Sequence, residues 1–135
     1  MELLLYGVVK FIAYSLWGYL GFRLHQKETG YLAKSVSFGA ARWVLGLALG
    51  ILVFFMVGSI DQEQVLSRYL AIYSPLRVFE WTFMGVLFFP TWQEKWKSPR
   101  IYYWIIGGIL LSFVTDLTSP QMLDGGRFCV GRCLC

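Results

Sequence analysis

Four ionisable residues inside long apolar stretches are the candidates for chemistry in this 135-residue chain. They are Lys10, Arg77, Glu80 and Asp116. Ionisable side chains in apolar, membrane-length segments are costly and usually face protein or a watery cavity, so they are functional candidates by default. Two of the four are basic and two are acidic, so pairing among them would balance their charges and lower the cost of burying them.

Two tyrosines share helical faces with these residues. Tyr73, Arg77 and Glu80 are separated by four and then three residues, which places them on one side of a helix. Tyr14 follows Lys10 by four residues on another segment. The spacing predicts a polar binding pocket with six lining residues: Lys10, Tyr14, Tyr73, Arg77, Glu80 and Asp116.

The residue types indicate two kinds of chemistry for this pocket. Lys10 and Arg77 could hold a phosphate or carboxylate headgroup, since a guanidinium offers a bidentate fork. Glu80 could carry a proton or act as a general base, although the neighbouring Arg77 favours its ionised form. A proton shared between Glu80 and Asp116 is not expected. Counted along their helices, the two residues would differ by roughly 11 Å in depth below the membrane surface. Alternatively, the four residues have a purely structural role. Lys10 and Asp116 then extend to the lipid headgroups at the membrane surface, and the Arg77–Glu80 ion pair holds two helices together.

The apolar stretches that carry these residues set the predicted fold. Hydrophobic residues make up 57% of the chain and charged residues only 15%, which excludes intrinsic disorder and disfavours a soluble domain. The stretches are near the roughly 20 residues that cross a bilayer as a helix, and they do not alternate as barrel strands do. We predict an all-α polytopic membrane protein, a four-helix transmembrane bundle with short loops over residues 1–118 and a tail over 119–135. The four predicted spans are residues 3–22, 38–60, 69–91 and 101–118.

Basic residues near the span ends predict the orientation. Seven of them flank one side (Arg23, Lys27, Lys34, Arg42, Lys95, Lys97 and Arg100) and three flank the other (Arg68, Arg127 and Arg132). The side richer in lysine and arginine faces the cytoplasm, so we expect a multi-pass protein of the cell (inner) membrane with both termini outside. The first span lacks the basic start and small-residue cleavage site of a signal peptide, which favours a retained helix. Six aromatic residues fall near the basic ends of three spans, as expected at headgroup depth: Trp43, Trp92, Trp96, Tyr102, Tyr103 and Trp104.

The second span carries a small-residue motif. Gly46 and Gly50 form a GxxxG pattern, which allows close helix packing inside the bundle or against a partner. Arg42, near the start of this predicted span, is interpreted as an anchor at its cytoplasmic end. With no other ionisable group, the span is expected to face lipid or a partner.

The tail and the single histidine carry weaker signals. Cys129, Cys133 and Cys135 are disulfide candidates if the tail is external, and idle thiols or a metal or redox role remain alternatives. His25 lies in a polar segment and is interpreted as a solvated loop residue. No zinc-protease, phosphate-loop or nucleophile-elbow motif is present, and the sequence indicates neither a metal site nor a particular cofactor.

These features favour a non-enzymatic accessory or structural subunit of a membrane complex. The alternative is a membrane enzyme or carrier that acts on an anionic lipid or amphiphile at an outer-leaflet polar pocket, and a proton- or ion-linked transporter is a third possibility. The expected partners are membrane lipids and either another protein or a second copy of the chain. No nucleic acid is expected, because the basic residues are too dispersed to follow a phosphate backbone.

Overall fold

The fold is all-α in the computed structural model, which describes residues 2–25, 30–57, 65–89 and 97–119. The predicted all-α class and the number of long helices are confirmed for these residues. Two of the helices are long and apolar enough to cross a membrane, over Leu4–His25 and Tyr31–Val53. The helices are α1 (Glu2–His25), α2 (Tyr31–Val57), α3 (Val65–Phe88) and α5 (Pro99–Asp116).

The main difference from the predicted boundaries lies at the start of α2. The helix begins at Tyr31, seven residues before the predicted span, and includes Lys34 and Ser35. These polar residues were assigned to a loop because they break the apolar run, but they lie in the first turns of the helix, where polar side chains are tolerated. Arg42 is consequently eleven residues into α2, roughly 16 Å along its axis.

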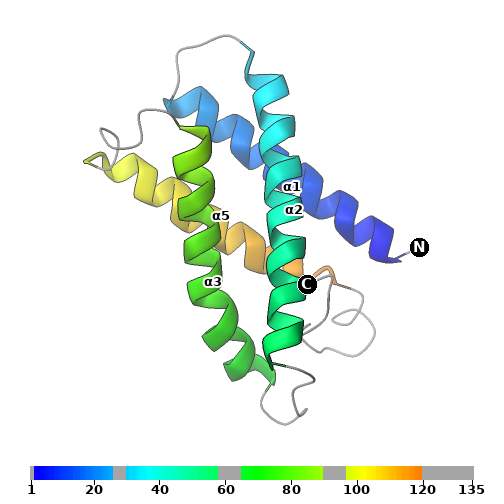
Figure 1. The fold of residues 1–135 in the computed structure, drawn as a ribbon. Helices are drawn as coiled ribbons and strands as arrows, with labels where there is room; N and C mark the ends of the chain where they lie inside the picture. The colour runs from blue at the N-terminus through cyan, green and yellow to red at the C-terminus, as the bar shows by residue number, and fades with distance from the viewer. Residues whose placement is uncertain (1, 26–29, 58–64, 90–96, 120–135) are drawn as a thin grey trace.

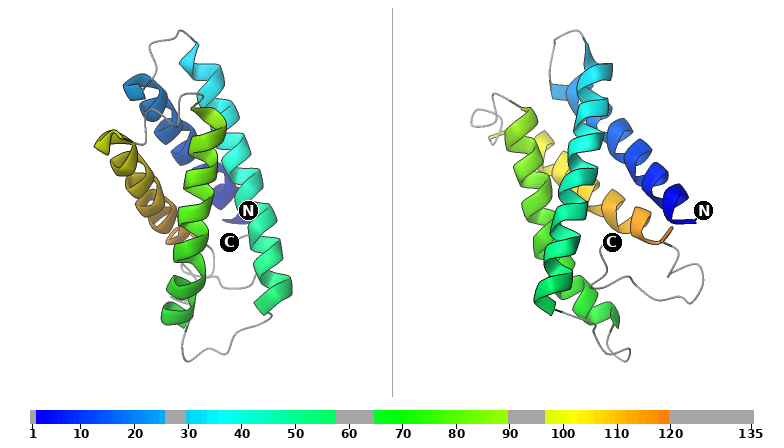
Figure 2. Two further views of the ribbon diagram at one scale, coloured as in Figure 1. Left: turned by 60° about the vertical axis from the view of Figure 1, so that its left-hand side comes forward. Right: turned by 45° about the vertical axis from the view of Figure 1, so that its right-hand side comes forward.

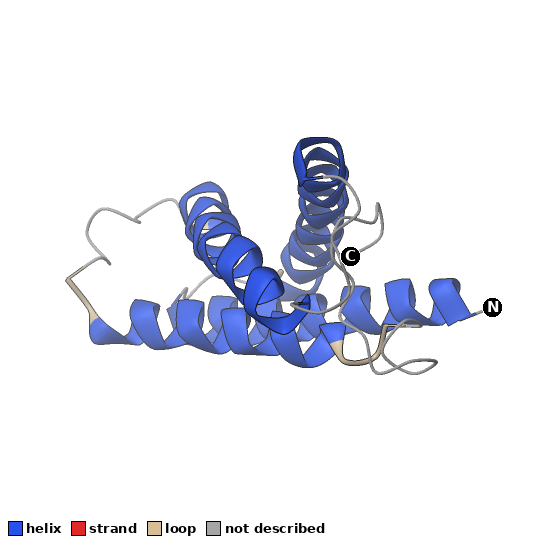
Figure 3. Ribbon diagram, turned by 90° about the horizontal axis from the view of Figure 1, so that it is seen from below, coloured by secondary structure: helices blue, strands red, loops and turns tan. Residues whose placement is uncertain are grey.

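The four described helices form a closed ring of neighbours. Helix α1 contacts α2 and α5, and α3 contacts α2 and α5, so each helix has two partners in the ring. Helices α1 and α5 run obliquely to α2 and α3 (Figures 1 and 2). Apart from short connections, the described residues are helical throughout (Figure 3). One end of α5 therefore comes close to helices that lie far from it in sequence.

Aromatic side chains fill one part of the core. Trp81 and Trp104 meet edge to face with ring centroids 5.3 Å apart, and Phe38 lies 5.9 Å from Trp81. Trp104 is only 4% exposed, so its indole packs inside the bundle, and its depth relative to the headgroups stays a prediction. It points inward because its helical face is shared with the buried Gly108, whereas Tyr103, on the adjoining face, is exposed.

Helices α1 and α5 are joined by a reciprocal contact between two tryptophans and two glycines. The Trp17 indole donates a hydrogen bond to the Trp104 carbonyl (3.1 Å), and the Trp104 indole donates to the Trp17 carbonyl (3.3 Å). Each ring lies on a glycine of the opposite helix, Trp17 on Gly107 and Trp104 on Gly21. A Cβ atom at either glycine would overlap the ring, so only glycine permits this approach.

The outer faces of all four helices carry large apolar side chains. Five charged side chains, by contrast, are among the buried residues of the interior. Both features depart from the usual soluble pattern, in which charged residues are almost never fully buried unless paired and large apolar patches are rarely exposed. Exposed examples from α1, α2, α3 and α5 in turn are Leu4, Leu16, Val44, Phe55, Phe79, Val86, Ile106 and Leu110.

Candidate functional site

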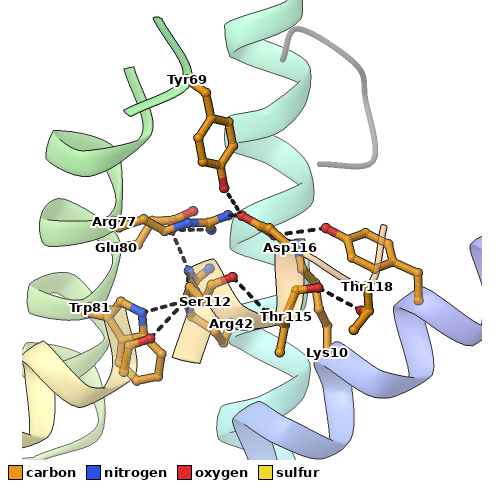
Figure 4. A network of polar contacts seen from close by, with 12 residues as sticks. Lys10, Arg42, Tyr69, Arg77, Glu80, Trp81, Ser112, Thr115, Asp116 and Thr118 are labelled. Carbon is orange, nitrogen blue, oxygen red and sulfur yellow. Dashed lines mark hydrogen bonds and ion pairs between the residues drawn. The ribbon is translucent and has the colours of Figure 1, made fainter. Parts of the chain in front are cut away.

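Asp116, the last residue of α5, is the centre of one half of a buried polar cluster (Figure 4). Its Oδ1 atom lies 2.6 Å from the Lys10 ammonium and accepts a hydrogen bond from the Tyr6 hydroxyl at 3.0 Å. Its Oδ2 atom accepts hydrogen bonds from the Tyr69 hydroxyl and, at 2.9 Å, from the Arg77 guanidinium. Each carboxylate oxygen therefore has two donors, which leaves Asp116 little capacity to accept a further proton or ligand.

Glu80 on α3 is the centre of the other half. Its Oε2 atom accepts hydrogen bonds from Arg42 of α2 at 2.5 Å and from Arg77 of its own helix at 2.9 Å. Because Arg77 also binds Asp116, its guanidinium joins the two halves. We call Lys10, Arg42, Arg77, Glu80 and Asp116 the ion-pair network; it draws on all four described helices.

Serine and tryptophan side chains extend the ion-pair network on one face of α5. The Trp81 indole donates to the Ser112 hydroxyl at 3.0 Å, and that hydroxyl donates to the Gly108 carbonyl at 3.0 Å. Arg42 lies 3.5 Å from the same hydroxyl. A Cβ atom at Gly108 would lie 2.6 Å from the Trp81 ring, so this glycine provides the space for the indole.

Arg42 is the residue that the sequence pattern assigned incorrectly. The prediction of an interfacial anchor is wrong: the side chain is 0% exposed and binds Glu80 inside the bundle. The associated prediction that this helix faces lipid or a partner fails for its Arg42 face. The signal that could have identified the residue is its spacing from Gly46, since a glycine one turn away gives a long side chain room to lie along its own helix.

The predicted depths of the two carboxylates are also wrong. One guanidinium, that of Arg77, contacts both Glu80 and Asp116 at 2.9 Å. A separation of roughly 11 Å along the membrane normal assumed parallel helix axes. Because α5 runs obliquely to α3, its end approaches the middle of α3 (Figures 1 and 2).

The two tyrosines predicted to line a pocket are core residues that flank arginines. Tyr14 is 2% exposed, and the Arg42 guanidinium lies over its ring at 4.9 Å from the centroid. Tyr73 is 1% exposed, and the Arg77 guanidinium lies 5.6 Å from its ring centroid. The structure thus gathers all six predicted residues in and around the ion-pair network, and whether they bind a ligand stays a prediction.

The cluster retains polar atoms with no hydrogen-bond partner among the described residues. These atoms include Oε1 of Glu80 and the Nε and NH1 groups of Arg42. A Cβ atom at Gly46 would lie 3.1 Å from that NH1 and 3.9 Å from that Oε1, so Gly46 faces the ion pair inside the bundle. Gly50 is buried on the same helix. Of the two carboxylates, Glu80 is therefore the one with an oxygen available to accept a hydrogen bond.

The weaker sequence signals concerned His25 and the carboxy-terminal cysteines. His25 is not a solvated loop residue: it ends α1, is half-buried, hydrogen-bonds the Gly21 carbonyl at 3.0 Å and packs on Phe89. The described residues contain no group of three or more metal-ligating side chains. Cys129, Cys133 and Cys135, together with Trp92 and Trp96, lie outside the described residues.

The chain matches no protein-family model, and neither a curated protein nor a solved structure is significantly similar to it.

Proposed function

We propose that this chain is an integral membrane protein in which all four described helices cross the bilayer. The support is the distribution of side chains: apolar residues cover the outside of every helix, and the charged network lies inside. Lipid solvates an apolar outer surface, and intramembrane charges are tolerated when they pair within protein. Resistance to extraction by alkaline carbonate, with release by detergent, tests membrane integration, and recovery in the carbonate supernatant contradicts it.

The proposed orientation has both termini outside. Four exposed basic residues lie at the end of α1, near the start of α2 and around the start of α5: Arg23, Lys34, Lys97 and Arg100. Arg68 is the exposed basic residue near the start of α3. The positive-inside rule directs the richer end to the cytoplasm. A phosphatase fused after Cys135 is expected to be active outside the membrane, and fluorescence of a cytoplasm-only reporter at the same position would reverse the orientation.

The role that the geometry supports best is a non-enzymatic accessory or structural subunit of a membrane complex. One observation carries this proposal: both oxygens of Asp116 are occupied by donors of the protein itself. A carboxylate in that state ties helices together and is poorly suited to bind substrate or take up a proton. The exposed apolar faces are then available to lipid and to a partner.

The experiment is purification of the full chain in mild detergent with wild-type and Glu80→Gln proteins side by side. A subunit is expected to emerge with a stoichiometric partner, and the variant, with Arg42 left unpaired, is expected to lose abundance and partner together. Thr82→Val, one turn from the exposed Val78 and half-buried, is a control on the same helix that leaves every charge in place. A wild-type protein that is stable, monomeric and partner-free contradicts the subunit role.

A second candidate function is supported by Glu80. Its Oε1 atom lacks a partner among the described residues, and it lies near unpaired groups of Arg42. Such a carboxylate could accept a proton from an amphiphile or act as a base toward it, in a membrane enzyme or carrier. In that case Glu80→Gln abolishes turnover or transport of an anionic amphiphile in proteoliposomes while abundance and folding are unchanged. If Glu80→Gln lowers the abundance of the protein as much as it lowers turnover or transport, the subunit role is favoured.

A further inference from the structure

A groove of about 390 Å³ lies between α1 and α5, away from the ion-pair network. Leu20 and Leu24 of α1 and Tyr103 of α5 are its exposed sides. Trp17 and Trp104, which are more buried, form its floor. Its volume falls within the range of about 300–1,000 Å³ typical of ligand pockets, and its lining is predominantly apolar, as such pockets are.

The floor of the groove is fixed in place by the packing of the two helices. The indoles of Trp17 and Trp104 are hydrogen-bonded to each other's backbone carbonyls. Gly21 and Gly107 let the rings lie directly on the opposite helix. The groove therefore exists before any ligand arrives, and binding does not have to order its floor.

One end of the groove is positively charged. Arg100 and His25 line it, and no acidic side chain does so among the described residues. Arg100 lies in the first turn of α5, where the Ser98 N-cap makes no side-chain hydrogen bond to the helix. The positive end of the α5 dipole is thus not offset by a capping side chain, and an anion there would be favoured by both the dipole and the guanidinium.

We propose that this groove binds one anionic phospholipid, with an acyl chain along Leu20 and Leu24 and the phosphate at Arg100 and the start of α5. The proposal rests on the membrane integration proposed above. In the proposed orientation this end lies at the cytoplasmic leaflet, whose lipids carry the negative charge. An apolar trough that ends in a cation and a helix N-terminus matches a molecule with an apolar tail and an anionic head.

Native mass spectrometry of the full chain in detergent tests whether the Arg100 end of the groove binds the phosphate. Phosphatidylglycerol is compared with phosphatidylcholine of the same acyl chains, and wild type is expected to bind the former more tightly. Arg100→Gln should weaken phosphatidylglycerol binding by about ten- to a hundredfold, the effect of losing one charge-assisted hydrogen bond. Arg68→Gln removes the same charge from an exposed position at the start of α3, and it should leave the affinity unchanged.

A pair of bulky substitutions tests the tail end. Leu20→Trp fills the groove and should displace the lipid, whereas Leu16→Trp, one turn earlier on the exposed face of α1, should not. Equal binding of the two lipids by wild type, or equal losses within either variant pair, overturns the proposal. So does a Leu20→Trp protein that releases a bound protein while keeping its lipid, because the occupant is then a polypeptide. Recovery of the chain in the carbonate supernatant is a separate result: it contradicts membrane integration, whereas the lipid-binding results above concern the groove alone.

Discussion

Replacing Glu80 and Arg42 separately tests the ion-pair network most directly, because their expected costs differ. Glu80→Gln leaves Arg42 without an ionic partner and Arg77 with Asp116 alone. Breaking a buried ion pair in this way costs about 3–5 kcal/mol. Arg42→Gln leaves Glu80 still bound to Arg77 at 2.9 Å, so no carboxylate loses its last ionic partner. The ion pair with Glu80 and the longer contact with Ser112 are lost, at about 1.5–3 kcal/mol.

The charge count of the network points in the same direction. The network contains three cations and two carboxylates, an excess of one positive charge. Removing Arg42 balances the charges, whereas removing the carboxylate of Glu80 raises the excess to two. The double variant should therefore cost less than the sum of the single variants, with a coupling of about 0.5–3 kcal/mol.

The assay is the free energy of unfolding of purified protein in mixed micelles, followed by tryptophan fluorescence as a denaturing detergent is titrated. Arg23→Gln is the control, because Arg23 is exposed at the end of α1, and its cost should stay within about 0.5 kcal/mol. If Arg42→Gln matches this control, Arg42 is an interfacial anchor after all and the network is wrong. If Arg42→Gln costs more than Glu80→Gln, the argument from shared partners is refuted.

Three other substitutions have expected outcomes in the same assay. Gly21→Ala should destabilise the protein by about 1–3 kcal/mol, because the added Cβ overlaps the Trp104 ring; an unchanged unfolding midpoint would show that α1 and α5 separate freely. Ser112→Ala should cost about 1–3 kcal/mol by leaving the Trp81 indole without its acceptor, and Ser112→Thr, which keeps the hydroxyl, should recover part of the loss. Tyr69→Phe should cost about 1.5–3 kcal/mol, since its hydroxyl donates to a charged carboxylate, and no loss would remove it from the cluster.

Apolar runs were sufficient to predict helices, because long stretches without the two-residue alternation of strands favour a helix. The helix boundaries were less predictable where polar residues begin a helix, as Lys34 and Ser35 do in α2. Because the predicted span began seven residues after the true start of α2, Arg42 was placed near the end of the helix instead of eleven residues into it. The local sequence does not distinguish polar residues that form the first turns of a helix from polar residues in the preceding loop.

The convergence of the charged residues was predictable in kind but not in detail. Balanced charges on separate spans indicated that Lys10, Arg77, Glu80 and Asp116 would meet, and the structure brings them into one network. Their pairing depends on the oblique course of α5, which no residue spacing encodes. The reciprocal hydrogen bonds of Trp17 and Trp104 could not be predicted from residue spacing either, because they join residues 87 positions apart.

The order in which the network is synthesised has a consequence for biogenesis. Lys10 and Arg42 lie on α1 and α2 and are translated before Glu80 and Asp116, which lie on α3 and α5. In a chain integrated into the bilayer as proposed above, α1 and α2 would carry these two cations before the carboxylates of α3 and α5 are made. The two halves are thus interdependent by charge, because Lys10 and Arg42 pair with carboxylates that only the later helices supply.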